Sequence, residues 1–250
     1  MSQGFAIGPV PEAFLIEVAK GNVPGHSVVH IRGFNSDIDL AATETLWEAG
    51  GIRVVPLVAG VATVVSTAAG DTVAGTGART IKLHGLENTT FVDVTETLTL
   101  NGLVPVVGAV LFERINYGTV ETAGATGSNE GMLTCTVGGL TQFGMSANEN
   151  ITQSAAYTIP AAKTGYLLSL TFGVSGAANA TGHGRLMVRS FGGLWQLEDH
   201  FLSDVSGSGV ERQYTLPLSF GEKTDIRIDA SVDINNTLAV GSMVILLVDD

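Results

Sequence analysis

Alternation of apolar and polar residues is the clearest pattern in the sequence, and residues 91–102 (FVDVTETLTLNG) show it best. Successive side chains of a strand point to opposite faces of a sheet, so this stretch predicts a half-buried strand that ends in an Asn-Gly turn. The outward row contains Thr95, Thr97 and Thr99, and Glu96 is one of two residues that break the alternation.

The preceding segment alternates in the same way. Ile81 and Leu83 fall on the inward side, and Lys82 and His84 fall on the outward side. The turn-forming stretch GLENTT then leads the chain back into residues 91–102. Two alternating segments joined by a short turn predict a β-hairpin.

The C-terminal half repeats this pattern at near-regular spacing. Turn signals separate seven strand-like segments, which are AYTIPA, GYLLSLTFGV, RLMVRSF, LWQLEDHF, RQYTLPLSF, DIRIDASV and LAVGSMVILLV. About seven short strands in about 100 residues are typical of a sandwich or jelly roll. We expect Trp195 to lie in one of these strands and to anchor the core, and Trp47 to do the same for the first half.

The first 40 residues have a different character, with Pro9, Pro11 and Pro24 between short apolar stretches. PEAFLIEVAKG predicts a short helix that begins at Pro11 and stops at Gly21. An extended arm laid on a neighbouring subunit is the alternative interpretation of the same segment.

The fold class that follows is all-β. We predict two β-sandwich or jelly-roll-like domains, at residues 41–150 and 151–250, preceded by an N-terminal arm at residues 1–40. Composition supports this prediction, because the chain of 250 residues is 45% hydrophobic and 14% charged and contains 32 glycines. Many glycines and β-branched residues with little charge are typical of strands joined by tight turns.

The net charge of the chain and the distribution of its basic residues limit which partners it can bind. The formal net charge is −12, and the 12 Lys and Arg residues are scattered singly. Phosphate neutralisation needs clustered basic residues, so we expect no nucleic-acid binding. The most apolar run, residues 54–69, is shorter than the roughly 20 residues of a membrane span and contains Pro56, so we expect no membrane partner.

Candidate chemistry is sparse. His26 and His30 share a strand face but lack a third metal ligand, and a calcium site at Asp37 with Asp39, or at Asp229 with Asp233, is explained as well by turn capping. The single cysteine, Cys135, lies in a strand-like stretch and reads as a small buried hydrophobe. We therefore expect no enzyme activity, no catalytic residues, no metal and no cofactor.

Several stretches, taken in order, resemble a family of virion structural proteins of tailed bacteriophages. They are GNVPGHSVVHIRGFNSDID (21–39), TLWEAGG (45–51), AGTGARTIKLHGL (74–86), ETLTLNGLVPV (96–106), FERINYGTVETAGATGSNEG (112–131), YTIPAAKTGYLLSL (157–170) and FGEKTDIRIDASV (220–232). The resemblance runs from about residue 20 to the end. It implies an all-β component of the particle and carries over no catalytic residues.

On this resemblance we expect a capsid cement or decoration protein that stabilises the head, assembled in the host cytoplasm and located in the virion. A tail or fibre protein that contributes to host adsorption is the alternative, with loops 175–184 and 203–210 at its tip. The expected partners are the major capsid protein or another virion protein and further copies of the chain, with a trimer guessed by analogy. The expected interface residues are Phe5, Ile7, Phe14, Leu15, Ile16, Thr95, Thr97 and Thr99.

Overall fold

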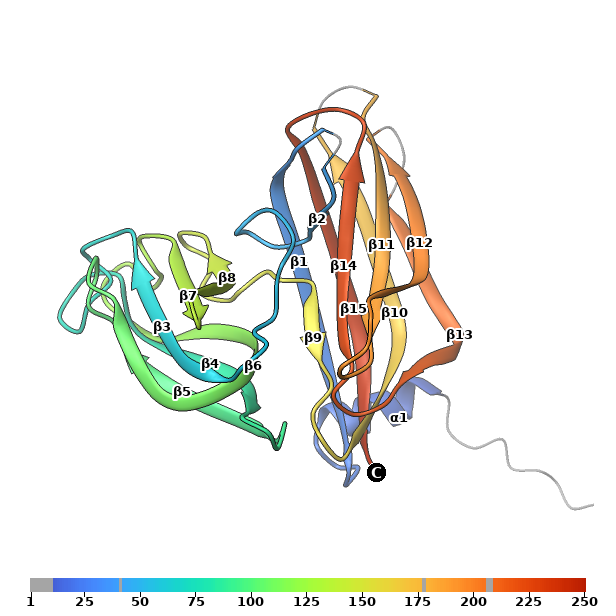
Figure 1. The fold of residues 1–250 in the computed structure, drawn as a ribbon, viewed down its shortest axis with the longest axis horizontal. Helices are drawn as coiled ribbons and strands as arrows, with labels where there is room; N and C mark the ends of the chain where they lie inside the picture. Colours follow the sequence, from blue (N-terminus) through green and yellow to red (C-terminus); the bar gives the residue numbers. More distant parts are fainter. Residues whose placement is uncertain (1–10, 41, 177–178, 206–208) are drawn as a thin grey trace, which may run out of the picture.

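The computed structural model describes residues 11–40, 42–176, 179–205 and 209–250. These residues form one helix, α1 (Pro11–Ala19), and fifteen strands, which confirms the all-β prediction. Figure 1 shows two bodies side by side, a tall sandwich that carries the C-terminus and a smaller curled unit beside it.

The sandwich consists of two antiparallel sheets packed face to face. The first sheet has the order β1 (His26–Ile38), β15 (Thr237–Asp249), β10 (Lys163–Ser175) and β13 (Val210–Phe220). The second has the order β12 (Gln196–Asp204), β11 (Thr181–Arg189), β14 (Asp225–Val232) and β2 (Glu44–Thr45), and β9 (Ala156–Thr158) also pairs with β14. Side chains from both sheets, among them Leu170, Phe172 and Ile228, form one hydrophobic core. All seven strands expected in the C-terminal half are present, as β9 to β15.

The curled body, called the central unit here, is a single six-stranded antiparallel sheet over residues 60–145. Its strand order is β5 (Asp93–Thr99), β4 (Ala78–Glu87), β6 (Val106–Ala123), β3 (Gly60–Ser66), β7 (Leu133–Val137) and β8 (Leu140–Met145). The sheet bends around a second hydrophobic core that includes Ile81, Phe112 and Phe143. The central unit therefore encloses its core by curvature of one sheet.

The predicted hairpin is confirmed, because β4 and β5 pair from Thr80 opposite Thr99 to Leu86 opposite Asp93. Glu96, which breaks the alternation, lies on the inward side of β5. Its Oε1 accepts hydrogen bonds from the backbone N–H groups of Ala109 (2.5 Å) and Val110 (3.2 Å). The carboxylate thus ties β5 to the start of β6 and holds the curl of the sheet.

The N-terminal segment differs from the predicted arm. Residues 11–19 form the predicted helix, and Gly21 follows it with a φ of +75°. Residues 26–38, however, are strand β1, which pairs along its length with β15 and so belongs to the sandwich. The reason is that the apolar residues of this stretch bury themselves against distant parts of the same chain, as Ile38 does completely.

The close packing of β1 gives the first prediction. A Cβ added to Gly33 would lie 2.4 Å from the Ala155 Cβ and 2.7 Å from the Leu46 carbonyl oxygen. Overpacking of this kind typically costs about 1–3 kcal/mol. Gly33→Ala is therefore expected to lower the free energy of unfolding by that amount, measured by chemical denaturation.

Gly173→Ala is the matched control, because Gly173 lies in β10 of the same sheet and its added Cβ would meet no atom closer than 3.5 Å. An equal loss of stability in both variants would contradict the packing of β1 described above.

A buried ion-pair cluster and the exposed faces around it

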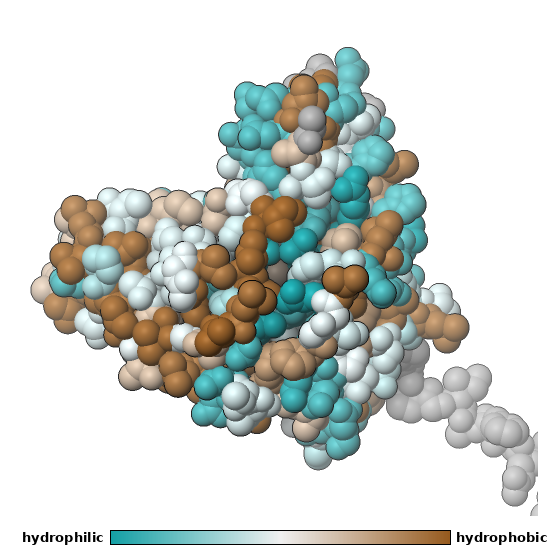
Figure 2. Space-filling view, in the orientation of Figure 1, coloured by the Kyte–Doolittle hydropathy of each residue, from teal (hydrophilic) through white to brown (hydrophobic). Residues whose placement is uncertain are grey.

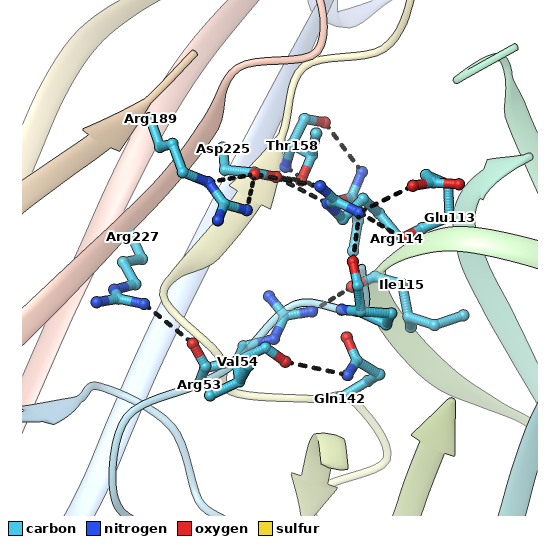
Figure 3. Close-up of polar contacts among 12 residues, drawn as sticks. Arg53, Val54, Glu113, Arg114, Ile115, Gln142, Thr158, Arg189, Asp225 and Arg227 are labelled. Carbon is cyan, nitrogen blue, oxygen red and sulfur yellow. Dashed lines mark hydrogen bonds and ion pairs between the residues drawn. The ribbon is translucent and has the colours of Figure 1, made fainter. Parts of the chain in front are cut away.

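The two bodies meet at a cluster of buried polar side chains centred on Asp225, at the start of β14 (Figure 3). Arg114 of β6 donates from Nε to the Asp225 Oδ1 at 2.9 Å, and Arg189 of β11 donates from Nη2 to Oδ2 at 2.5 Å. The Thr158 hydroxyl donates to Oδ1 at 2.7 Å. One carboxylate thus receives hydrogen bonds from both bodies of the molecule.

Two opposing effects, burial and the hydrogen bonds and charges of its partners, set the pKa of Asp225. Burial alone would raise the pKa of its carboxyl group, but the hydrogen bonds from Arg114, Thr158 and Arg189 and the charge of Arg114 outweigh burial. The net effect is a lowered pKa, so the group is ionised at neutral pH. Because a buried charge is costly unless it is paired, this carboxylate depends on its arginines and they depend on it.

Arg53 occupies the segment that leads from the sandwich into the central unit. Its guanidinium donates to the Ile115 carbonyl of β6, and its own carbonyl accepts from Arg227 Nη1 at 3.0 Å. The side chain is buried, and burial lowers its pKa to about 10, so it remains charged at neutral pH. Arg53 therefore connects β6 of the central unit to β14 of the sandwich through one residue.

Amide side chains complete the junction. Asn116 of β6 donates to the Thr158 carbonyl at 3.2 Å and accepts from the Thr158 N–H at 3.0 Å, as a strand partner would. Gln142 of β8 donates to the Val54 carbonyl at 3.3 Å. Both carboxylate oxygens of Asp225 accept hydrogen bonds, and side chains of one body bond to backbone groups of the other or of the connecting segment. The cluster therefore acts as a structural junction between the two bodies.

Trp195 corrects a prediction. It lies before β12 rather than in a strand, is only half-buried, and does not belong to the sandwich core. Its ring lies 4.1 Å from the Arg227 guanidinium and 4.8 Å from that of Arg189. An electron-rich indole face attracts cations, which explains why the residue covers the arginines instead of the apolar core. Trp47 is buried, and its Nε1 donates to the Gly51 carbonyl at 2.9 Å.

The acidic candidates in β14 and after it have structural partners. Asp229 is buried, pairs with Arg227 at 2.9 Å and accepts from the Thr45 hydroxyl at 2.8 Å. Asp233 accepts from both the N–H and the hydroxyl of Thr181 at 2.7 Å. Asp37 and Asp39 are exposed. Over the described residues there is no group of three His, Cys, Asp or Glu side chains that could hold a metal ion.

The other candidates are placed as follows. His26 lies 2.9 Å from the Pro24 carbonyl through Nδ1 and contacts the Phe14 ring edge, while His30 is exposed on the same strand. Cys135 is fully buried in β7, and burial raises the pKa of its thiol to about 12. Within the described part of the chain, no helix is both long and apolar enough to cross a membrane.

The predicted interface residues lie on two separate surfaces. Thr95, Thr97 and Thr99 are exposed on β5, as the alternation predicts, and Thr97 donates to Glu121 at 3.0 Å. On α1, Phe14 and Ile16 are exposed and Leu15 is half-buried, and Phe5 and Ile7 lie outside the described residues. Parts of the loops proposed for a fibre tip, residues 177–178 and 206–208, also lie outside them.

A large apolar surface, which the sequence patterns did not single out, covers the other side of the central unit. On β6 the outward residues Val107 and Leu111 are 63% and 47% exposed, and they stand opposite Thr63 and Val61 of β3. The preceding segment adds Leu57 and Val58, which are 89% and 78% exposed. Figure 2 shows hydrophobic residues gathered over this unit and over the segment that joins it to the sandwich. We call these six residues the outer face.

No protein-family model matches the chain, and no curated protein matches it. Among solved structures, it is similar to the infectious bursal disease virus Gt strain structure, with 8% identity, a TM-score of 0.26, and coverage of 96% of this chain and 78% of the other. The VP2 subviral particle of the same virus gives 10% identity, a TM-score of 0.24 and the same coverage. Scores of this size do not establish a common fold, so the function has to be inferred from the chain's own residues.

The Asp225 cluster gives the second prediction. Asp225→Asn removes the carboxylate that Arg114 and Arg189 share and leaves Arg114 with only the longer pair to Glu113, at 3.5 Å. Removal of one partner of a buried ion pair typically costs about 3–5 kcal/mol. We expect a loss of that size in the free energy of unfolding at pH 7. Glu121→Gln, which alters the more exposed pair with Lys82, is the control and is expected to cost at most about 1 kcal/mol.

The lowered pKa of Asp225 also determines how the stability loss in Asp225→Asn depends on pH. The pKa of Asp225 is lowered in the folded protein, so its contribution is complete above the ordinary aspartate pKa of about 3.9 and disappears as the pH falls through the lowered value. The stability difference between the wild type and Asp225→Asn should therefore shrink in acid below about pH 4. A difference that is constant with pH would rule out an ionised Asp225 as its source.

Proposed function

We propose that this chain is a structural protein of a virion, and specifically a cement or decoration subunit on the head of a tailed bacteriophage. The observation that carries the proposal is the outer face of the central unit. The ordered series of motifs that resemble tailed-phage virion proteins supports the same assignment. On this proposal the chain acts by docking its surfaces on other proteins of the particle.

The outer face has the character of a contact surface. Val61 stands opposite Leu111, and Thr63 opposite Val107, so apolar and threonine side chains form cross-strand pairs on either side of a β-bulge. Val58 lies two residues before β3 and is 78% exposed. Soluble monomers rarely leave contiguous apolar patches of more than a few hundred Å² exposed, and larger patches usually mark interaction sites.

The energetics fit assembly. Full burial of a Val or Leu side chain stabilises by about 1.5–3 kcal/mol relative to exposure, so a few such residues supply much of a protein–protein contact. The partner that we propose is the major capsid protein or another protein of the shell. Further copies of this chain are a second contact, for which the exposed Phe14 and Ile16 of α1 are available. A trimer is proposed by analogy with the family that the sequence resembles.

The polar face of β4 and β5 is a separate candidate contact. Thr95, Thr97 and Thr99 stand opposite His84, Lys82 and Thr80, so this face carries polar side chains on both strands. Such a face is compatible with solvent or with a polar subunit joint.

The third prediction tests the location and the outer face together. Gold-labelled antibody against the protein is expected to decorate the heads of purified particles. The double variant Val107→Lys with Leu111→Lys is expected to fold normally, because surface substitutions usually change stability by about 0.5 kcal/mol or less, and to reduce occupancy on the particle at least tenfold.

Leu194→Lys with Leu216→Lys is the matched control, because both leucines are 85% exposed but lie on the sandwich. Full occupancy by this control, with loss by the outer-face variant, supports the proposal. Label on the tail instead of the head would favour the tail or fibre alternative, and unchanged occupancy of the outer-face variant would overturn the docking role of that face.

A further inference from the structure

A cleft of about 230 Å³ lies between the sandwich and the central unit, away from the outer face. Strands of both bodies line it, with Ser27 from β1, Tyr157 from β9, His84 and Asp93 from β4 and β5, and Tyr117 from β6. It is smaller than the 300–1,000 Å³ of pockets for drug-sized ligands, so it suits one small group or the end of a longer side chain.

Five polar side chains that line this cleft have no hydrogen-bond partner in the described part of the chain. In the described part of the chain, the hydroxyls of Ser27, Tyr117 and Tyr157, the imidazole of His84 and the carboxylate of Asp93 make no hydrogen bond or ion pair. Tyr157 is only 4% exposed as a residue, and the charge of Asp93 acts on its hydroxyl. These side chains lie at the surface of the cleft, so they are free to bind a group that enters it.

Contacts within the chain hold one wall of the cleft in place. The His84 and Tyr117 rings stack with their centroids 4.2 Å apart and an interplanar angle of 13°. The neighbouring Asn116 is fixed by its two hydrogen bonds to Thr158. The cleft therefore has a preformed wall that spans the junction of the two bodies.

Asp93 is the only acidic side chain that lines the cleft, and no lysine or arginine lines it. Burial raises the pKa of the Asp93 carboxyl group more than the positive charge of Lys163 lowers it, and Lys163 is itself paired with Asp249 at 2.5 Å. Burial and then the positive charge of Lys82 lower the pKa of His84, so this ring is neutral at pH 7. Burial and the charge of Asp93 raise the pKa of both tyrosine hydroxyls, so they are neutral as well.

Every one of these groups can accept a hydrogen bond, and the only formal charge among them is negative. A primary ammonium group offers three N–H donors and a positive charge, which matches a carboxylate surrounded by hydroxyl and imidazole acceptors. We propose that the cleft between β1, β4, β5, β6 and β9 binds an alkylammonium group, with Asp93 as its counter-ion and Tyr157 as a buried acceptor. The two sources of this chemistry are the lysine side chain of a partner protein and a free polyamine.

The test is calorimetric titration of the full chain with three probes. They are Nα-acetyl-lysine methylamide, its neutral analogue with a hydroxyl in place of the ammonium, and putrescine. We expect the lysine probe to bind at least tenfold more tightly than the hydroxyl analogue. Putrescine that binds tenfold more tightly than the lysine probe would identify a polyamine site, and similar affinities would identify a partner lysine.

Single substitutions test whether the lysine probe binds at this cleft. Asp93→Asn is expected to weaken binding of the lysine probe at least tenfold, and Tyr157→Phe, which removes only the hydroxyl, to weaken it several-fold. Asp37→Asn removes the same charge from an exposed position at the other end of β1 and is expected to leave binding unchanged. Thermal unfolding of each variant verifies that it is folded.

Three results would overturn the inference. They are binding of the hydroxyl analogue as tightly as the lysine probe, equal affinity in wild type and Asp93→Asn, and no binding of any amine at millimolar concentration. The inference does not depend on the virion assignment, so the particle experiments and these titrations can fail separately.

Discussion

The ion pair between Arg114 and Asp225 joins two bodies that have separate hydrophobic cores. Leu170, Phe172 and Ile228 belong to one core, and Ile81, Phe112 and Phe143 belong to the other. What holds the bodies at a fixed angle is therefore largely polar. A buried ion pair contributes little net stability compared with apolar packing, but it tolerates few geometries, because any displacement leaves a charge without a partner. The structure thus uses charge to define an orientation and apolar burial to stabilise each part.

The path of the chain reinforces this junction. Strands β1 and β2 precede the central unit and β9 follows it, so the central unit is inserted into the sandwich by two connecting segments. These segments touch each other and the sheet, since Ala155 donates to the Leu46 carbonyl at 2.8 Å and Ile228 donates to the Ala155 carbonyl at 2.9 Å. Leu46 in turn donates to the Ile228 carbonyl at 2.9 Å. Both connections therefore end on β14, next to the Asp225 cluster.

Sequence patterns predicted the positions of strands and turns, because these depend on residues that are close together in the chain. The alternation at Ile81 and Leu83 places β4 correctly, and the regular turn signals locate all seven C-terminal strands. They could not show that the side of β14 with Arg227 and Asp229 is also buried, since Thr45 and Arg53 cover it from more than 170 positions away. Trp195 was expected in a strand of the core, but the arginines that it covers come from β11 and β14, which its own sequence neighbourhood does not reveal. The cleft at Tyr157 is lined by residues from six strands, and spacing along the sequence cannot predict which distant strands meet.

The attachment of the central unit by two connecting segments also has a mechanical consequence. A force that pulls on the central unit is transmitted through β2 and β9 together, and both are hydrogen-bonded to the same strand, at Asp229 opposite Thr45 and Asp225 opposite Thr158. Two attachments that share a load must both give way before the bodies separate, whereas a single tether would yield at its weakest bond. A molecule fastened by its central unit would in this way pass tension into the middle of its sandwich instead of into a free end.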